Sequence, residues 1–252
     1  MIAKICAAGA TDVIQHGATW READEYLRSK ILARDPNGVY VPPFDHADIW
    51  TGNSTIITEL TGQLGQPDAL VCSVGGGGLL NGIMLGVEHQ NWPSTTILAL
   101  ETSGADSLAT SLHAGHLITL PEITSMATSL GAKRVSAKTF ELAQHEAVKS
   151  VVLTDADVAR ACCRFADDER LLVEMACGAS VAVCYDGCLR NILPHLTPES
   201  KVVVVVCGGS NISLETLADY RQRFGSEDKV VLKDAKCAVP SALTAQRVAK
   251  RM

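Results

Sequence analysis

The sequence predicts an α/β protein in which a parallel sheet is covered by helices on both faces. Segments with strand character alternate with segments of helical periodicity along most of the 252 residues. Two of the strand segments, at 69–74 and 201–207, are almost entirely apolar, and each ends at a group of glycines. Alternation of this kind favours a parallel sheet with helices on both sides.

The first part of the chain contains three of the expected elements and the end of a fourth. Residues 1–8 read like the end of a helix, and Gly9 suits a helix C-terminus, so we expect the chain to begin inside an element. A short strand at 12–16, an amphipathic helix at 20–33 and a short strand at 39–41 follow. This strand–helix–strand order begins the α/β pattern.

The same pattern continues through the rest of the chain. Asp155 is a good N-cap for the helix that we expect to start there, and the small residues after Met175 allow close packing of a long helix. The expected elements are helix 49–64, strand 69–74, helix 79–89, strand 96–101, a short helix near Ser107, helix 138–147, strand 150–154, helix 155–165, helix 176–192, strand 201–207 and helix 213–224.

Composition narrows the function classes. Of the residues, 47% are apolar and 20% are charged, which is typical of a globular protein. The net charge of −6 argues against a nucleic-acid partner. No segment approaches the roughly 18 apolar residues that a membrane helix needs. The N-terminus has no apolar core typical of a secretory signal, so we expect a cytoplasmic protein with small-molecule partners.

The cysteines fit a reducing compartment. Nine are scattered through apolar runs, as is usual for reduced, buried thiols. Cys184 and Cys188 are spaced to share a helix face, which leaves a metal site as an alternative, but no nearby Cys or His pair completes a four-ligand set.

The strongest chemical signal is the glycine run at 75–78, which follows an apolar strand and precedes a helix. Successive glycines let backbone N–H groups converge, and the helix N-terminus adds its positive dipole end, so the run predicts a phosphate site. A dinucleotide fingerprint would need a third glycine where Leu80 stands, and a P-loop would need Gly-Lys-Ser/Thr. A glycine turn without a ligand remains the structural alternative.

A second glycine turn, C-G-G-S-N at 207–211, also follows an apolar strand. Both turns would lie at the carboxyl ends of parallel strands, where open α/β sheets bind ligands, so we expect them to line one pocket. Cys207 would present a neutral thiol to a ring nitrogen there. The alternative is a cysteine buried in the core.

Six segments together resemble the cytosolic L-serine dehydratase / L-threonine deaminase family. They are V-Y-V-P-P-F-D at 39–45, G-G-G-G-L-L at 75–80, L-E-T-S-G-A at 100–105, I-T-S-M-A-T-S-L-G-A at 123–132, L-V-E-M-A-C-G-A at 172–179 and V-C-G-G-S-N-I-S-L at 206–214. The resemblance covers the chain from about residue 8 to residue 224. It implies a pyridoxal 5′-phosphate (PLP) enzyme of fold type II, similar to the tryptophan synthase β chain. Serine racemase and cysteine synthase share the glycine run but fit the segments around Glu101 and Cys207 less well.

The resemblance also implies roles for individual residues. The backbone amides of Gly75, Gly76, Gly77, Gly78 and Leu79 would hold the cofactor phosphate, and Cys207 would face the pyridine nitrogen. The resemblance further implies a site for a monovalent cation, usually potassium. Its ligands would be Glu101 and the backbone oxygens of Gly75, Ala105, Leu130 and Ala132. From spacing alone, Glu101 reads as a surface carboxylate at a strand end.

Two family motifs are absent from these 252 residues. The family holds PLP on a lysine in an S-x-x-F-K-x-R-G type motif, followed by an S-x-G-N type loop, and neither occurs here. No lysine of this chain inherits the Schiff-base role, so we name no catalytic residue. We therefore expect an N-terminally truncated chain without the first strands of the fold. Residues 1–44 would be a remnant of the small domain, 45–225 the large PLP-binding domain and 226–252 a C-terminal tail.

Two functions follow from the resemblance. The first is a PLP-dependent L-serine and L-threonine ammonia-lyase, which forms pyruvate and ammonia from serine by α,β-elimination and is a homodimer in its full-length form. The alternative is a non-catalytic homologue that retains the phosphate site or binds a full-length partner.

Overall fold

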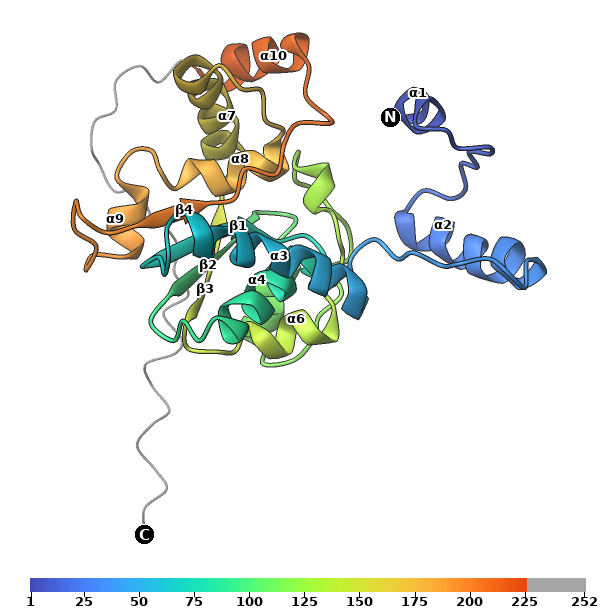
Figure 1. The fold of residues 1–252 in the computed structure, drawn as a ribbon. Coiled ribbons are helices and arrows are strands. Elements are labelled where there is room, and N and C mark those ends of the chain that lie inside the picture. The colour runs from blue at the N-terminus through green and yellow to red at the C-terminus, as the bar shows by residue number, and fades with distance from the viewer. Residues whose placement is uncertain (226–252) are drawn as a thin grey trace. The chain divides into compact units, whose positions relative to one another are not determined.

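A computed structural model describes residues 1–225 of the chain (Figure 1). The chain divides into two compact units. The first comprises Met1–Pro43, and the second begins at Phe44. The C-terminal tail expected at 226–252 lies outside the described residues.

The first unit is largely helical. Helix α1 spans Ile2–Ala7, and α2 spans Trp20–Tyr26. A π-helical turn at Leu27–Ile31 and a 3₁₀ turn at Leu32–Arg34 prolong α2, which confirms the helix predicted at 20–33.

The N-terminus of α2 forms a capping box. The Thr19 hydroxyl accepts the N–H of Glu22 at 3.3 Å, and the Glu22 carboxylate accepts the N–H of Ala18 at 2.8 Å. The strands predicted at 12–16 and 39–41 are wrong, since neither segment forms a strand. A lone strand leaves its backbone groups unpaired, and no residue of this unit is fully buried.

The second unit contains a four-stranded parallel sheet. Its strands are β1 (Ala69–Ser73), β2 (Thr96–Thr102), β3 (Val148–Leu153) and β4 (Val202–Val204), in the order β3-β2-β1-β4. Val71 of β1 is in register with Leu98 of β2 and Val204 of β4. The sheet confirms the predicted fold class, although β4 is shorter than the strand expected at 201–207.

Helices connect these strands. They are α3 (Ala47–Gln63), α4 (Gly78–His89), α5 (Ser107–Ala114), α6 (Ala137–Leu142), α7 (Asp155–Glu169), α8 (Met175–Ala182), α9 (Cys188–Ile192) and α10 (Leu214–Phe224), with a 3₁₀ turn at Thr128–Leu130.

Successive side chains along each strand belong alternately to two separate hydrophobic cores. Val71 of β1 packs with the helices α7 to α10, whereas Leu70 and Cys72 pack with α3 and α4. In Figure 1, α7, α8 and α10 lie on one side of the sheet and α4 and α6 on the other. The helices therefore cover both faces, as predicted.

Two local predictions were wrong. The single helix expected at 176–192 is broken into α8 and α9, because Asp186 and Gly187 both adopt positive φ angles, of 52° and 73°. Cys184 and Cys188 therefore do not share a helix.

The cap of α7 also differs from the prediction. Thr154 caps this helix and accepts the N–H of Asp157 at 3.1 Å, so Asp155 is not the N-cap. Its carboxylate is free to make contacts outside the helix.

Candidate functional site

The two glycine turns lie side by side because β1 and β4 are neighbours in the sheet. From β1 the chain adds β2 and β3 on one side and returns to the other side of β1 for β4. This reversal is the topological switch point, where open α/β sheets bind their ligands. The Ser73 hydroxyl and the Cys207 thiol lie 3.8 Å apart across it, which supports the expected shared site.

The first turn presents a row of free backbone donors. Ser136 N–H donates to the Gly76 carbonyl at 3.0 Å, and Asn81 N–H donates to the Gly77 carbonyl at 2.9 Å. Because a trans peptide points its N–H opposite to its C=O, these bonds turn the N–H groups of Gly77 and Gly78 away from α6 and α4. Among the described residues, no protein acceptor bonds to any amide N–H from Gly75 to Leu80.

These free donors fit a phosphate. Gly77 and Gly78 are buried, and a buried N–H without a partner is costly unless a ligand satisfies it. The turn also forms the N-terminus of α4, whose dipole favours an anion.

Packing explains the glycines themselves. A Cβ at Gly76 would overlap the Phe44 ring, one at Gly77 would overlap Thr139, and one at Gly78 would lie 2.8 Å from the Phe44 carbonyl oxygen. Gly77 also has a φ of 98°, which other residues rarely adopt. The evidence for a phosphate is therefore the direction of the N–H groups rather than the glycine content.

The second turn exposes Cys207, so the alternative of a cysteine buried in the core is wrong. A hydrogen bond from the Cys177 thiol lowers the pKa of Cys207, and the Ser73 hydroxyl acts in the same direction. The same bond and burial raise the pKa of Cys177. Because its pKa is lowered, Cys207 loses its proton at a lower pH than an ordinary cysteine, which disfavours the neutral thiol expected from the sequence.

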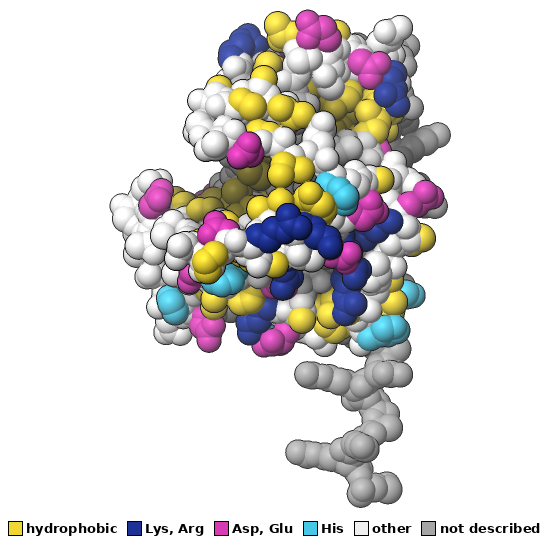
Figure 2. Space-filling model, turned by 90° about the vertical axis from the view of Figure 1, so that its right-hand side faces the viewer, with side chains coloured by type: hydrophobic (Ala, Val, Ile, Leu, Met, Phe, Trp, Pro, Cys, Tyr) yellow, Lys and Arg dark blue, Asp and Glu magenta, His cyan; other side chains and the backbone are white. Residues whose placement is uncertain are grey.

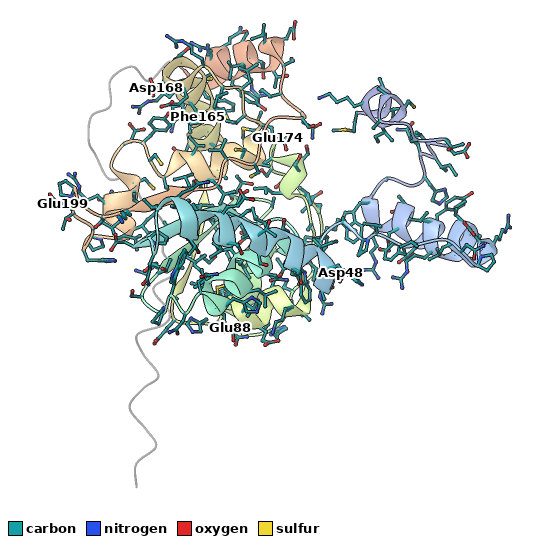
Figure 3. All side chains as sticks on the ribbon, in the orientation of Figure 1. Asp48, Glu88, Phe165, Asp168, Glu174 and Glu199 are labelled. Atoms are coloured by element: carbon teal, nitrogen blue, oxygen red, sulfur yellow. The ribbon has the colours of Figure 1, made fainter. Side chains whose placement is uncertain are left out.

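Glu174 and Asn211 hold the second turn in place. The Glu174 carboxylate accepts the Asn211 N–H at 2.7 Å, and Glu174 N–H donates to the Gly208 carbonyl at 3.2 Å. Glu174 precedes α8 (Figure 3). The Asn211 side chain also donates to Ser129 Oγ at 3.0 Å.

Glu101 is fully buried at the end of β2, so it is not a surface carboxylate. Its two carboxylate oxygens accept the N–H groups of Leu108 and Ala109, each at 2.8 Å, at the start of α5. Burial raises the pKa of Glu101 to about 8, although both amide hydrogen bonds oppose the shift. A cation beside this carboxylate would favour its charged form.

Two of the four carbonyl groups expected to join Glu101 are unpaired among the described residues. Ala132 is buried, and no donor there bonds to its carbonyl or to that of Gly75, whereas Ala105 is paired with Thr102 in an isolated antiparallel bridge. Within residues 1–225, the Leu130 carbonyl accepts the N–H of Ala132 alone, at 2.8 Å. Unpaired carbonyls and a carboxylate are oxygen ligands of the kind that a hard cation takes.

Three residues of this region were missed from the sequence. Phe44 lies within the V-Y-V-P-P-F-D segment but was given no role, and its ring covers Gly76. Thr139 bonds to the Gly76 carbonyl at 3.3 Å, which no sequence pattern indicates. The sequence predicts Asp155 only as a helix cap, yet its carboxylate binds Ser125 and Met126, which precede Leu130.

Other site types have no support in residues 1–225. No group of three or more His, Cys, Asp and Glu side chains there is arranged to hold a metal ion. Within the same residues, no helix is both long and apolar enough to span a membrane. On the face drawn in Figure 2, acidic and basic side chains are interspersed.

An open parallel sheet with a turn of unpaired amide N–H groups at its switch point is typical of α/β proteins that bind phosphate-bearing ligands. Comparison with known proteins specifies the cofactor. The model of the "pyridoxal-phosphate dependent enzyme" family matches residues 1–208, and the chain belongs to this family.

Comparison with individual proteins shows which members of this family the chain is similar to. The chain is 44% identical over 229 residues to an L-serine dehydratase of Saccharomyces cerevisiae, covering 85% of this chain and 68% of the relative. It is 46% identical over 212 residues to a serine dehydratase-like protein of Rattus norvegicus, covering 82% and 64%. The crystal structure of an L-serine ammonia-lyase from Rhizomucor miehei superposes with a TM-score of 0.82 at 40% identity, covering 88% and 70%. The chain thus spans about two thirds of the length of these relatives, and its fold is that of type II PLP enzymes.

Proposed function

We propose that this chain forms the phosphate-binding and pyridine-facing part of a PLP-dependent L-serine and L-threonine ammonia-lyase. The row of unpaired amide N–H groups from Gly75 to Leu79 carries the proposal, because it offers several donors to one anion at the N-terminus of a helix. Identity of 44% to an L-serine dehydratase supports the substrate class.

The residues at the two turns would have separate tasks. The amides from Gly75 to Leu79 would bind the phosphate, and Cys207 would contact the ring nitrogen, with its charge adjusted by Cys177 and Ser73. When bound, PLP supplies a ring that withdraws electrons from the substrate carbon whose proton is removed. The protein's part is to hold the cofactor and to set the electrostatics around it.

A monovalent cation, with potassium as the expected ion, would bind beside the first glycine turn, residues 75–78, here called the phosphate turn. Its ligands would be Glu101 and the carbonyls of Gly75, Ala105, Leu130 and Ala132. The burial of Glu101 and the unpaired carbonyls support this assignment. The cation would connect the phosphate turn to the segment that contains Leu130, so we expect potassium to strengthen PLP binding.

The partners follow from the same family membership. Serine and threonine are the proposed substrates, and we propose a cytoplasmic location and a homodimer for the full-length form. No role for nucleic acid or a membrane is proposed.

A non-catalytic PLP-binding protein is a second candidate, and the contacts of three lysines favour it. Three lysines that the structure describes are engaged elsewhere. Lys133 and Lys201 donate to backbone carbonyls, and Lys138 pairs with Glu141. None of these contacts involves the glycine turns.

Equilibrium dialysis of the purified chain tests the phosphate site. PLP is compared with pyridoxal, which lacks the phosphate. Because the free 5′-hydroxyl of pyridoxal closes onto its aldehyde, pyridoxine 5′-phosphate, which has no aldehyde to react with surface lysines, is the control and should also bind more tightly than pyridoxal. We expect PLP to bind at least about tenfold more tightly, and inorganic phosphate to compete with it. Equal binding of PLP and pyridoxal would contradict the proposal.

Sequencing the native transcript upstream of the Met1 codon separates the two candidates. An in-frame S-x-x-F-K segment would support the ammonia-lyase, and pyruvate release from L-serine would then be assayed on the native protein. A stop codon directly upstream of Met1 would favour the non-catalytic protein.

A further inference from the structure

Residues 123–132, here called the bridging turn, contact both glycine turns. A Cβ built on Gly75 would lie 3.3 Å from the Cα of Leu130, so this part of the bridging turn packs directly against the phosphate turn. On its other side, Ser129 Oγ accepts a hydrogen bond from the Asn211 side chain at 3.0 Å. The position of the bridging turn therefore affects the surroundings of both the phosphate and Cys207.

One carboxylate anchors the bridging turn to the start of α7. Asp155, the first residue of α7, accepts the Ser125 hydroxyl at 2.7 Å with one oxygen and the Met126 N–H at 2.8 Å with the other. Charge-assisted bonds of this kind are stronger than bonds between neutral groups. Both oxygens of Asp155 thus hold neighbouring residues of one segment.

The hydroxyl hydrogens of this network have defined directions. Because Ser125 donates its only hydroxyl hydrogen to Asp155, its oxygen accepts from the Thr102 hydroxyl at 2.8 Å and from the Ala127 N–H at 3.0 Å. Thr102 and Ser125 are buried, and Thr102 directly follows Glu101. The network joins the start of α7, the bridging turn and the end of β2.

We propose that Asp155 is a positioning residue, which holds the bridging turn so that the carbonyls of Leu130 and Ala132 can complete the potassium site beside Gly75. This inference rests on the proposed function, because it assigns a role in building that site. The proposal assigns Asp155 no contact with the cofactor or the cation, because its two oxygens are engaged by Ser125 and Met126. Its effect passes through the backbone of the bridging turn.

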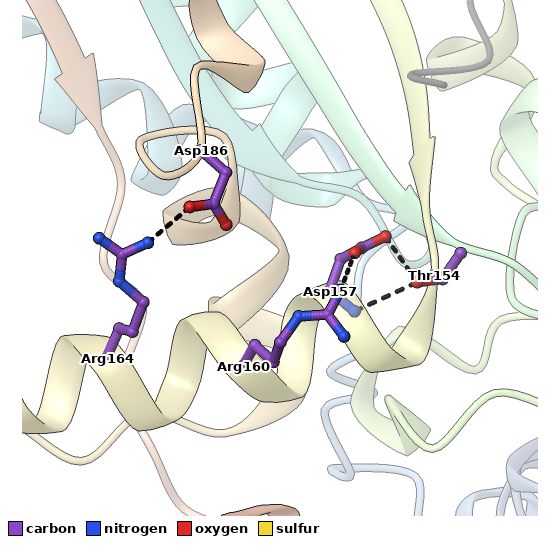
Figure 4. A network of polar contacts seen from close by, with 5 residues as sticks. All are labelled: Thr154, Asp157, Arg160, Arg164 and Asp186. Carbon is purple, nitrogen blue, oxygen red and sulfur yellow. Dashed lines mark hydrogen bonds and ion pairs between the residues drawn. The ribbon is translucent and has the colours of Figure 1, made fainter. Parts of the chain in front are cut away.

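Asp157 provides a matched control in the same helical turn. It interacts with Thr154 and Arg160, both local to the start of α7 (Figure 4). Asp157→Asn and Asp155→Asn remove the same charge from the same part of α7, but only Asp155→Asn weakens the anchor of the bridging turn. The amide nitrogen that Asp155→Asn introduces cannot accept a hydrogen bond from Ser125 or Met126.

The test measures PLP binding by the full 252-residue chain over a series of KCl concentrations, with choline chloride keeping the ionic strength constant. The KCl concentration that gives half of the maximal gain in PLP affinity should be at least about fivefold higher for Asp155→Asn than for the wild type and Asp157→Asn. We also expect the PLP affinity of Asp155→Asn to recover at saturating KCl. Because potassium that binds the native state would also stabilise a damaged fold, circular dichroism in choline chloride alone checks that Asp155→Asn is folded as Asp157→Asn is.

The outcomes separate this inference from the proposed function. If the wild type does not distinguish PLP from pyridoxal, the proposed phosphate site fails. If potassium improves PLP binding by the wild type, and Asp155→Asn responds as Asp157→Asn does, the positioning role alone is overturned.

A second variant and an exchange measurement cover the case in which Asp155→Asn does not fold. Ser125→Ala removes one partner of Asp155 and should raise the half-maximal KCl concentration at least about twofold. In the wild type, the Met126 amide should exchange with deuterium at least about tenfold more slowly than an exposed loop amide. Rapid exchange at Met126 would overturn the anchor.

Discussion

Ser73 and Cys207 lie in contact although 134 residues separate them in the chain, with 3.8 Å between the hydroxyl oxygen and the sulfur. The contact arises because β1 and β4 pair in parallel, so that the residues at their carboxyl ends meet. It places a polar group and a thiol at the switch point of the sheet. Chemical labelling of Cys207 therefore reports directly on the site.

Alkylation of Cys207 should be unusually fast near neutral pH. The thiolate is the reactive form, its fraction rises with pH through the pKa, and the hydrogen bond from Cys177 lowers that pKa. Cys177→Ala should shift the midpoint of the pH–rate profile of Cys207 upward. Peptide mapping by mass spectrometry after reaction with iodoacetamide measures this profile. An unchanged midpoint in Cys177→Ala would show that Cys177 does not set the reactivity, and the exposed Cys6 serves as an internal reference.

Gly77→Ala should weaken both the fold and the phosphate site. The added Cβ would overlap Thr139, and the φ of 98° is strained for alanine, so we expect a loss of about 2 kcal/mol in the free energy of unfolding. PLP affinity should fall by roughly tenfold or more. Gly62→Ala is the matched control, because a Cβ there meets nothing within 4 Å. Because Gly62 lies in α3, Gly62→Ala should raise the free energy of unfolding by about 0.5–1 kcal/mol. Urea denaturation of the two variants measures both changes.

Glu101→Gln should remove the effect of potassium. The variant loses the charge that would bind the cation and one of the two acceptors at the start of α5. A ligand at 100 times its Kd stabilises a protein by about 2.7 kcal/mol, so the melting temperature of the wild type should rise with KCl and that of the variant should not. The exposed Glu88→Gln should respond as the wild type does. A full potassium response in Glu101→Gln would remove Glu101 from the proposed site.

Thr139→Val should loosen the phosphate turn. The buried Thr139 hydroxyl bonds to the Gly76 carbonyl at 3.3 Å and to Ser136 Oγ at 2.8 Å, and valine keeps the shape but loses both bonds. We expect a loss of about 1–2 kcal/mol in the free energy of unfolding, together with weaker PLP binding. The exposed Thr58→Val should change the stability by less than about 0.5 kcal/mol. If only the stability of Thr139→Val changes, Thr139 supports the fold and not the phosphate site.

Local sequence patterns were sufficient to predict the sheet and its two glycine turns. The apolar runs of β1 and β4 and the helical periodicity between strands involve neighbours along the chain, so they could be recognised without tertiary information. The same local reasoning failed for the short segments at 12–16 and 39–41, because strand formation requires a partner. It also failed at Asp186 and Gly187, where the backbone leaves the helical region and divides α8 from α9.

The assembly of the site, in contrast, depends on contacts between distant segments. The pairing of β1 with β4 brings Ser73 to Cys207, and the burial of Glu101 changes it from an expected surface group into a carboxylate with a raised pKa. The role of Asp155 was likewise hidden, because its partners Ser125 and Met126 lie 30 and 29 residues earlier in the chain. Periodicity and capping rules describe neighbours along the chain, whereas hydrogen bonds and burial depend on which distant segments the fold brings together.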